Sequence, residues 1–179
     1  LRFAVRGLER EVGVNGLARY RLRLLGAFQL VAPNGERLDV TSKKAIALLA
    51  LLASADFGER WRAWIQDKLW GSRELRQAQS SLRLELHRLR KLTAGPPFPL
   101  VEATSRTVRL NLSMIDIDIR NEEIVARSTG EFLEGIDIAG EESFEEWLRE
   151  MRNNIADLSS SLPADRKTSS PANTNSSHG

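Results

Sequence analysis

The first regular pattern along the chain is an alternation of apolar and polar positions. Tyr20, Leu22 and Leu24 are separated by arginines, which is the period-2 pattern of a strand with one buried face. Two more short strands are expected over 27–31 and 38–40, joined by a PNGE segment whose Asn-Gly pair favours a type I′ turn. These strands predict a small antiparallel sheet with one polar face.

Helical spacing replaces the alternation in the next part of the chain. A run of alanines and leucines capped by Thr41 or Ser42 predicts a buried helix. In ERWRAWIQDKLWG, Trp61, Trp64 and Trp70 recur near every third or fourth position, so we expect a second helix with these tryptophans in the core. A third helix, AQSSLRLELHRLRKL, is ended by the prolines that follow it.

A hairpin and an acidic region complete the pattern. The β-type runs 100–103 and 107–112 flank a polar Thr-Ser-Arg tip and therefore predict a hairpin. Beyond it, two acidic helices are expected over Asn121–Ser128 and Glu142–Ile155, linked by a glycine-containing turn. From Ser159 the chain is rich in Ser, Pro, Asn and Thr and has little apolar content, which predicts disorder.

Charge is distributed unevenly along the sequence. Residues 1–110 carry 20 Lys and Arg against 10 Asp and Glu, a net charge of +10, whereas residues 111–158 carry 4 against 13, a net charge of −9. The basic part favours a polyanionic partner and the acidic part repels one. We therefore expect the two parts to serve different functions.

The composition excludes several classes of site. With no cysteine and only two histidines, the chain offers no disulfide, thiolate site or histidine cluster, and it suits a reducing cytoplasm. The apolar run 45–53 is too short to span a membrane, and the opening residues are too charged for a signal peptide. Asp116 and Asp118 have no third ligand or base nearby, so we interpret them as solvated and expect no metal, cofactor or catalysis.

The third predicted helix has two faces of different chemistry. Ala78, Leu86 and Leu89 fall within about 40° of Leu82, since each residue advances ~100°, and they form its core stripe. The opposite face is basic and carries Leu84 among polar groups. On the residues alone, this face is either an ordinary solvated surface or the contact surface of a polyanion.

Helix, helix, basic amphipathic helix and hairpin is the element order of a winged helix. The segments SKKAIALLALLA, WRAWIQDKLWG, AQSSLRLELHRLRKL and the TVRL hairpin resemble the DNA-binding domain of OmpR/PhoB-type regulators. Within that group they are most similar to the SARP regulators (Streptomyces antibiotic regulatory proteins), through the LW pair that closes the second helix and the LR…L..LR run of the third. The segment GEFLEGIDIAGEESFEEWLRE resembles the start of the bacterial transcriptional activator domain in those regulators.

The resemblance covers roughly Arg19 to Asn154 and departs from the family at three points. No receiver domain precedes the sheet, so phosphorylation control is not expected. The activator-type segment is shortened to two expected helices, fewer than a helical array needs to bury a continuous core. Gln79 stands where many relatives carry an arginine, so a base preference does not transfer from the family.

The resemblance implies an α+β fold: a winged helix-turn-helix with an N-terminal antiparallel sheet, three helices and a C-terminal hairpin wing, plus a short helical appendage. The expected parts are an irregular lead-in (1–18), a DNA-binding domain (19–112), a partial acidic activator-type domain (113–158) and a disordered tail (159–179). It implies a sequence-specific, double-stranded DNA-binding transcriptional activator of the bacterial cytoplasm and nucleoid. Its partners would be promoter DNA, RNA polymerase and a second copy bound head-to-tail on direct repeats.

Each candidate DNA-contacting residue has an expected role. Arg83 and His87 would meet base edges, with an exposed surface histidine as the equal alternative for His87. Leu84 would cover a thymine methyl, while Arg88 and Arg90 would hold phosphates. The small side chains of the helix let its backbone approach DNA. The candidates on the third helix are Ser80, Ser81, Arg83, Leu84, His87, Arg88, Arg90 and Lys91.

Three further candidates lie outside that helix. Arg106, at the hairpin tip, is expected at the minor groove or its phosphates, by similarity to the wings of related proteins. Lys43 and Lys44 open the first helix and either contact phosphate or are simply solvated. A second hypothesis remains for the whole chain: an interaction module whose basic domain binds an acidic protein surface, its own acidic segment included, rather than DNA.

Overall fold

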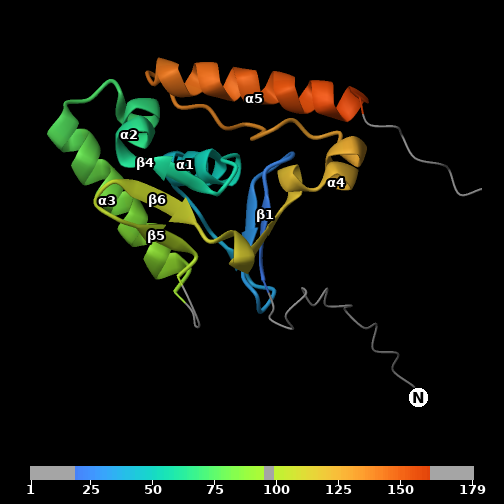
Figure 1. Cartoon of the computed structure of the whole chain (residues 1–179), viewed down its shortest axis with the longest axis horizontal. Coiled ribbons are helices and arrows are strands. Elements are labelled where there is room, and N and C mark those ends of the chain that lie inside the picture. Colours follow the sequence, from blue (N-terminus) through green and yellow to red (C-terminus); the bar gives the residue numbers. More distant parts are fainter. Residues whose placement is uncertain (1–18, 95–98, 162–179) are drawn as a thin grey trace, which may run out of the picture.

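The computed structural model describes residues 19–94 and 99–161 of the 179-residue chain. The expected lead-in 1–18 and the tail beyond Ser161 lie outside these residues. Within them the chain forms an α+β fold of two small sheets and several helices (Figure 1). In chain order the elements are β1 (Tyr20–Arg23), β2 (Gln29–Val31), β3 (Arg37–Leu38), α1 (Lys43–Ala53), β4 (Glu59–Trp61), α2 (Arg62–Trp70), α3 (Leu75–Leu92), β5 (Val101–Ala103), β6 (Thr107–Leu110), η1 (Leu112–Met114), β7 (Ile115–Ile117), η2 (Asp118–Arg120), α4 (Glu122–Arg127) and α5 (Glu142–Ser161).

The first sheet has the strand order β3-β2-β1-β7. Its first three strands pair antiparallel, as the alternating pattern predicts. On the other side of β1, β7 pairs parallel, with Tyr20 opposite Ile115. The alternation of Ile115, Asp116 and Ile117 has the period of a strand, but its parallel pairing with β1 joins residues far apart in the chain and was not predicted.

The connection between β2 and β3 differs from the predicted type I′ turn. Gly35 has a φ of 88°, but Asn34 does not share the positive φ that a type I′ turn requires. The Gly35 N–H donates to the Ala32 carbonyl at 2.8 Å, so Pro33 and Asn34 form the centre of the turn and Gly35 follows it. The side chain of Asn34 accepts the Glu36 N–H at 2.9 Å, which stabilises this turn instead.

The second sheet has the order β4-β6-β5 and contains the predicted hairpin. The prediction that residues 59–61 begin the second helix was wrong, because they form β4 and pair antiparallel with β6. The Leu110 N–H donates to the Gly58 carbonyl at 2.8 Å and extends this pairing to the preceding turn. As a result α2 begins at Arg62, and Trp61 is 61% exposed rather than part of the core.

Helix α1 occupies the centre of the fold and is buried from Ala45 to Ala53. Ser42 caps it, since its Oγ accepts the Ala45 N–H at 3.2 Å. Both α2 and α3 pack against α1, together with β4 and β6. Helix α5 crosses α2 near one end and α4 near the other, while α3 and the β5–β6 hairpin lie on another side of the molecule (Figure 1).

The acidic segment shares this core. The sequence analysis places a boundary after Leu112, but a single cluster of buried side chains crosses that point. Phe132, Phe144 and Trp147 belong to the cluster, with ring centroids 6.0 and 5.5 Å from Trp147. The disorder predicted from Ser159 was wrong for residues 159–161, because α5 continues to Ser161, and the Oγ atoms of Ser160 and Ser161 donate to the carbonyls of Ala156 and Leu158 in its last turns.

Asp118 is buried, although it was predicted to be solvated. Its Oδ2 accepts the N–H groups of Leu24 and Leu25, both at 2.8 Å, and its Oδ1 accepts that of Ile119 at 2.8 Å. Burial raises the pKa of Asp118, and the three N–H donors oppose that rise only in part. Asp116 pairs with Arg19 at 2.9 Å. Both carboxylates of the Asp-x-Asp pair therefore serve the packing of β7 against β1.

Candidate functional site

Helix α3 presents the two faces that its periodicity predicts. Ala78, Leu82, Leu86 and Leu89 are buried, which confirms the core stripe. On the opposite side, Leu84 is 48% exposed. The side chains that share this exposed side are Ser80, His87, Arg88 and Lys91, and the exposed Arg83 lies on the flank beside it. A broad basic surface with one apolar member thus runs along the helix.

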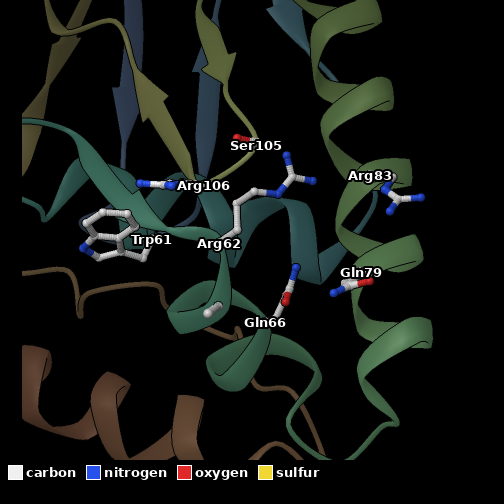
Figure 2. Close-up of a pocket in the computed structure, with 8 residues that line it drawn as sticks. Trp61, Arg62, Gln66, Gln79, Arg83, Ser105 and Arg106 are labelled. Carbon is white, nitrogen blue, oxygen red and sulfur yellow. The ribbon is translucent and has the colours of Figure 1, made fainter.

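A groove separates α3 from the tip of the β5–β6 hairpin. Its volume is about 520 Å³, and the start of α2 forms its floor. Figure 2 shows Arg62 between the hairpin tip on one side and α3 on the other. The residues lining this arginine groove are Trp61, Arg62, Ala63, Gln66, Gln79, Arg83, Ser105 and Arg106.

Arg62 is held at the centre of the groove by two contacts with the hairpin. Its backbone N–H, the first of α2, donates to the Arg106 carbonyl at 2.8 Å. Its Nη1 donates to the Thr104 carbonyl at 2.9 Å. Burial, followed by the charges of Arg83 and Arg90, lowers the pKa of the Arg62 guanidinium. The site is therefore built around a guanidinium that already experiences repulsion from its neighbours.

A second, smaller hollow continues the groove along α3. Its volume is about 250 Å³, and Arg62 and Arg83 line both hollows. Arg90 lies beside His87 in this part and donates from Nε to the Val101 carbonyl at 3.2 Å. The bond holds Arg90 against the hairpin, although the residue as a whole is exposed.

These four arginines form no ion pair within the described residues. In the part of the chain that the structure describes, no carboxylate lies within 4.0 Å of the charged nitrogens of Arg62, Arg83, Arg90 or Arg106. Like charges held this close are unfavourable unless a counter-charge reaches them. The arrangement is suited to binding an anion with several charged groups.

Two predicted site residues lie on the other flank of α3. Ser81 accepts a hydrogen bond from Arg73 Nη1 at 3.2 Å. Arg88 forms an ion pair with Glu85, with Nη1 and Oε1 3.3 Å apart. Because residues 81 and 88 are separated by about two helical turns, they share a flank that is turned away from the hairpin. The predicted site is thus split between the groove and this second flank.

Lys43 and Lys44 form ion pairs with carboxylates of the acidic segment. Lys43 Nζ lies 2.5 Å from Asp137 Oδ1, and Lys44 Nζ lies 2.8 Å from Glu141 Oε1. Lys44 also lies over the ring of Trp70, at 5.2 Å from its centroid. Each lysine thus has a carboxylate partner within the chain that competes with phosphate, and its contact with DNA stays a prediction.

Sequence reasoning missed the residue at the centre of the groove. The tryptophan-rich pattern does not distinguish Arg62 from the other polar residues of its helix, and Gln79 stands out only as a departure from the family pattern. Recognition of β4 would have placed Arg62 at a helix start beside the hairpin. Gln66 and Glu85 are buried polar residues that carry no sequence signal separating them from exposed ones.

Across residues 19–94 and 99–161, no group of three metal-ligating side chains is brought together. No helix in the same ranges has the length and apolar character needed to cross a bilayer. No protein-family model matches the chain, and no curated protein matches it either.

Proposed function

We propose that this chain is a sequence-specific, double-stranded DNA-binding transcriptional regulator whose residues 19–112 act as a winged helix. The observation that carries the proposal is the arginine groove together with the smaller hollow that continues it, where Arg62, Arg83, Arg90 and Arg106 gather from α2, α3 and the hairpin and form no ion pair within the described residues. DNA is a polyanion with one charge for each ~1.7 Å of duplex, and such a surface binds it through release of counterions.

We infer how the chain docks on DNA from the positions of α3, the hairpin and Arg62. Helix α3 enters the major groove, which is about 12 Å wide and admits a helix. The hairpin acts as the wing and reaches the neighbouring minor groove through Arg106. Arg62 lies between these two elements and therefore faces the phosphates that separate the two grooves.

We assign the reading of base edges to the exposed side of α3. Arg83 and His87 are exposed and can reach base edges, and the exposed Leu84 is placed to cover a thymine methyl. Arg62 and Arg90, each bonded to the hairpin backbone, are assigned to phosphates, which position a protein without reading sequence. The resemblance to SARP regulators extends the proposal to activation: recruitment of RNA polymerase and binding of two copies on direct repeats, in the bacterial cytoplasm.

The arrangement of the acidic segment favours this proposal over the protein-interaction alternative in its intramolecular form. In that alternative the segment would cover the arginine groove. Its ion pairs within the described residues are instead made with Arg19, Lys43, Lys44 and Arg152. The arginine groove is left open to another partner.

Substitutions in the groove test the proposal. We expect Arg62→Ala, Arg83→Ala and Arg106→Ala each to weaken binding to a mixed-sequence duplex about three helical turns long by about tenfold, because each removes a phosphate or base contact. Binding is measured by fluorescence anisotropy at several salt concentrations, and each lost phosphate contact lowers the salt slope by about 0.9.

Arg37→Ala is the matched control, since Arg37 is an exposed arginine in β3, in the other sheet. It removes the same charge and should leave affinity within about twofold of wild type. If Arg37→Ala weakened the affinity for the duplex as much as the groove substitutions do, binding would depend on overall charge and not on this groove.

A further inference from the structure

Glu85 is the only acidic residue within α3, whose other charged residues are arginines and a lysine. Its side chain is 11% exposed, and its Oε1 accepts from Arg88 Nη1 at 3.3 Å. Its Oε2 is buried and has no hydrogen-bond partner in the described structure. A buried carboxylate oxygen without a partner is unfavourable, so this residue is not explained by packing alone.

The position of Glu85 and Arg88 on α3 indicates which part of a bound duplex they would face. Arg83 and Arg90 lie on the hairpin side of α3, whereas Arg88 and Ser81 lie on the opposite flank, with Arg73 beside them. A helix in the major groove has a phosphate backbone along each flank. If the proposed function holds, on which this inference rests, Arg88 and Arg73 face the strand that the arginine groove does not contact.

We propose that Glu85 lowers the affinity of α3 for DNA by competing with phosphate for Arg88. Arg88 is 59% exposed and can turn toward a phosphate, but its bond to Glu85 must first be lost or shared. Glu85 thus neutralises one of the two arginines on that flank and sets how strongly α3 holds any duplex.

Glu85→Gln tests this role, because glutamine keeps the size of the side chain and removes its charge. We expect the variant to bind the mixed-sequence duplex about threefold to tenfold more tightly and its salt slope to increase by about 0.9, which corresponds to one added phosphate contact. Glu131→Gln is the matched control: Glu131 pairs with Arg152 at 3.2 Å in the acidic segment, and its loss changes the net charge equally.

A double-mutant cycle with Arg88→Gln separates this role from a general charge effect. If Glu85 acts through Arg88, Glu85→Gln should have little effect on affinity when Arg88 is already replaced. A gain that persists unchanged in the Arg88→Gln background overturns the proposal, and so does an unchanged affinity and salt slope in the single variant. Glu85→Leu is assessed in the same way if the glutamine variant does not fold.

This outcome is distinguishable from failure of the proposed function. If wild-type protein has no measurable affinity for the duplex at low salt, the proposed function fails and this inference fails with it. If wild type binds and loses affinity on Arg62→Ala, but Glu85→Gln changes nothing, only the role of Glu85 is overturned.

Discussion

Gly58 shows how much one residue contributes to the placement of the site. It connects α1 to β4 with a φ of 69°, and a Cβ at this position would lie 2.7 Å from the Leu110 carbonyl oxygen. The Gly58 carbonyl in turn accepts the Leu110 N–H at 2.8 Å. This close approach holds β4 against β6 and so places Arg62 beside the hairpin.

We expect Gly58→Ala to reduce the free energy of unfolding by about 3 kcal/mol, because left-handed strain and a backbone clash add together. Gly135→Ala is the control: its φ is 72°, but nothing lies within 4 Å of the added Cβ, so the strain alone should cost about 1 kcal/mol. Urea unfolding of both variants provides the measurement. Equal losses would show that the contact with Leu110 has no energetic role.

Individual residues differ in how far sequence alone predicts them. The buried face of α3 was predictable because burial on a helix repeats every 3.6 residues and Leu82 and its neighbours keep that period. Arg62 was not predictable in the same way, since its place depends on the pairing of Trp61 with Thr107, far along the chain. Glu85 lies beside the buried stripe, where periodicity does not distinguish a covered side chain from an exposed one.

At the scale of elements, Glu141 ties the turn between α2 and α3 to the acidic segment. Its carboxylate accepts Lys44 Nζ at 2.8 Å, the Ser72 N–H at 3.2 Å and the Ser72 Oγ–H at 3.1 Å. Burial raises the pKa of Glu141, but the hydrogen bonds and charge of Lys44 and Ser72 lower it more, so the pKa lies below its ordinary value. The ionised carboxylate is therefore favoured in the folded state.

We expect Glu141→Gln to lower the free energy of unfolding by about 2 kcal/mol at neutral pH, since it leaves Lys44 without its partner. For a depressed pKa, the stabilisation is complete above the value for unfolded glutamate, about 4.3, and is lost as the pH falls through the lower folded value. The difference in free energy of unfolding between wild type and Glu141→Gln, measured by urea unfolding, should therefore become smaller as the pH is lowered below about 4. Glu142→Gln is the control, because Glu142 is an exposed neighbour. If the difference in free energy of unfolding between wild type and Glu141→Gln stays constant with pH, this role of the ionised carboxylate is contradicted.

The elements themselves were predictable in proportion to their length. Helices α1, α3 and α5 contain several periods of a pattern, and each was predicted, although α5 extends six residues past its expected end at Ile155. Strands β4 and β7 have three residues each, and their pairing with β6 and β1 is decided by tertiary contact rather than by local pattern. The unpredicted pairing of these two strands explains two errors: the wrong start of α2 at the site, and the solvated interpretation of Asp118 away from it.

At the scale of the whole molecule, the basic and acidic parts form one structure. The charge asymmetry suggested two units, yet β7 completes the first sheet and Phe132, Phe144 and Trp147 complete its core. Charge counts along a sequence cannot show which lysines an acidic segment will meet. The pairing of Lys44 with Glu141 is a consequence of the fold.

A chain ending at residue 112 should consequently fail to fold cooperatively. It lacks β7, leaves the edge of β1 unpaired and exposes the side chains that Phe144 and Trp147 cover. A chain ending at residue 161 keeps every described element and is the control. Thermal melting followed by circular dichroism gives the comparison, and a sharp transition in the shorter chain would show that residues 19–112 are an independent unit.

The central claim is that the arginine groove and the exposed side of α3 bind duplex DNA and read its sequence. Selection of bound duplexes from a random pool, followed by titration of the selected duplex against a shuffled one, tests it most directly. We predict enrichment of one common sequence, bound roughly 10³-fold more tightly than the shuffled duplex, with this preference reduced by Arg83→Ala. Equal affinity for the selected and shuffled duplexes, or no enrichment at all, would contradict the claim.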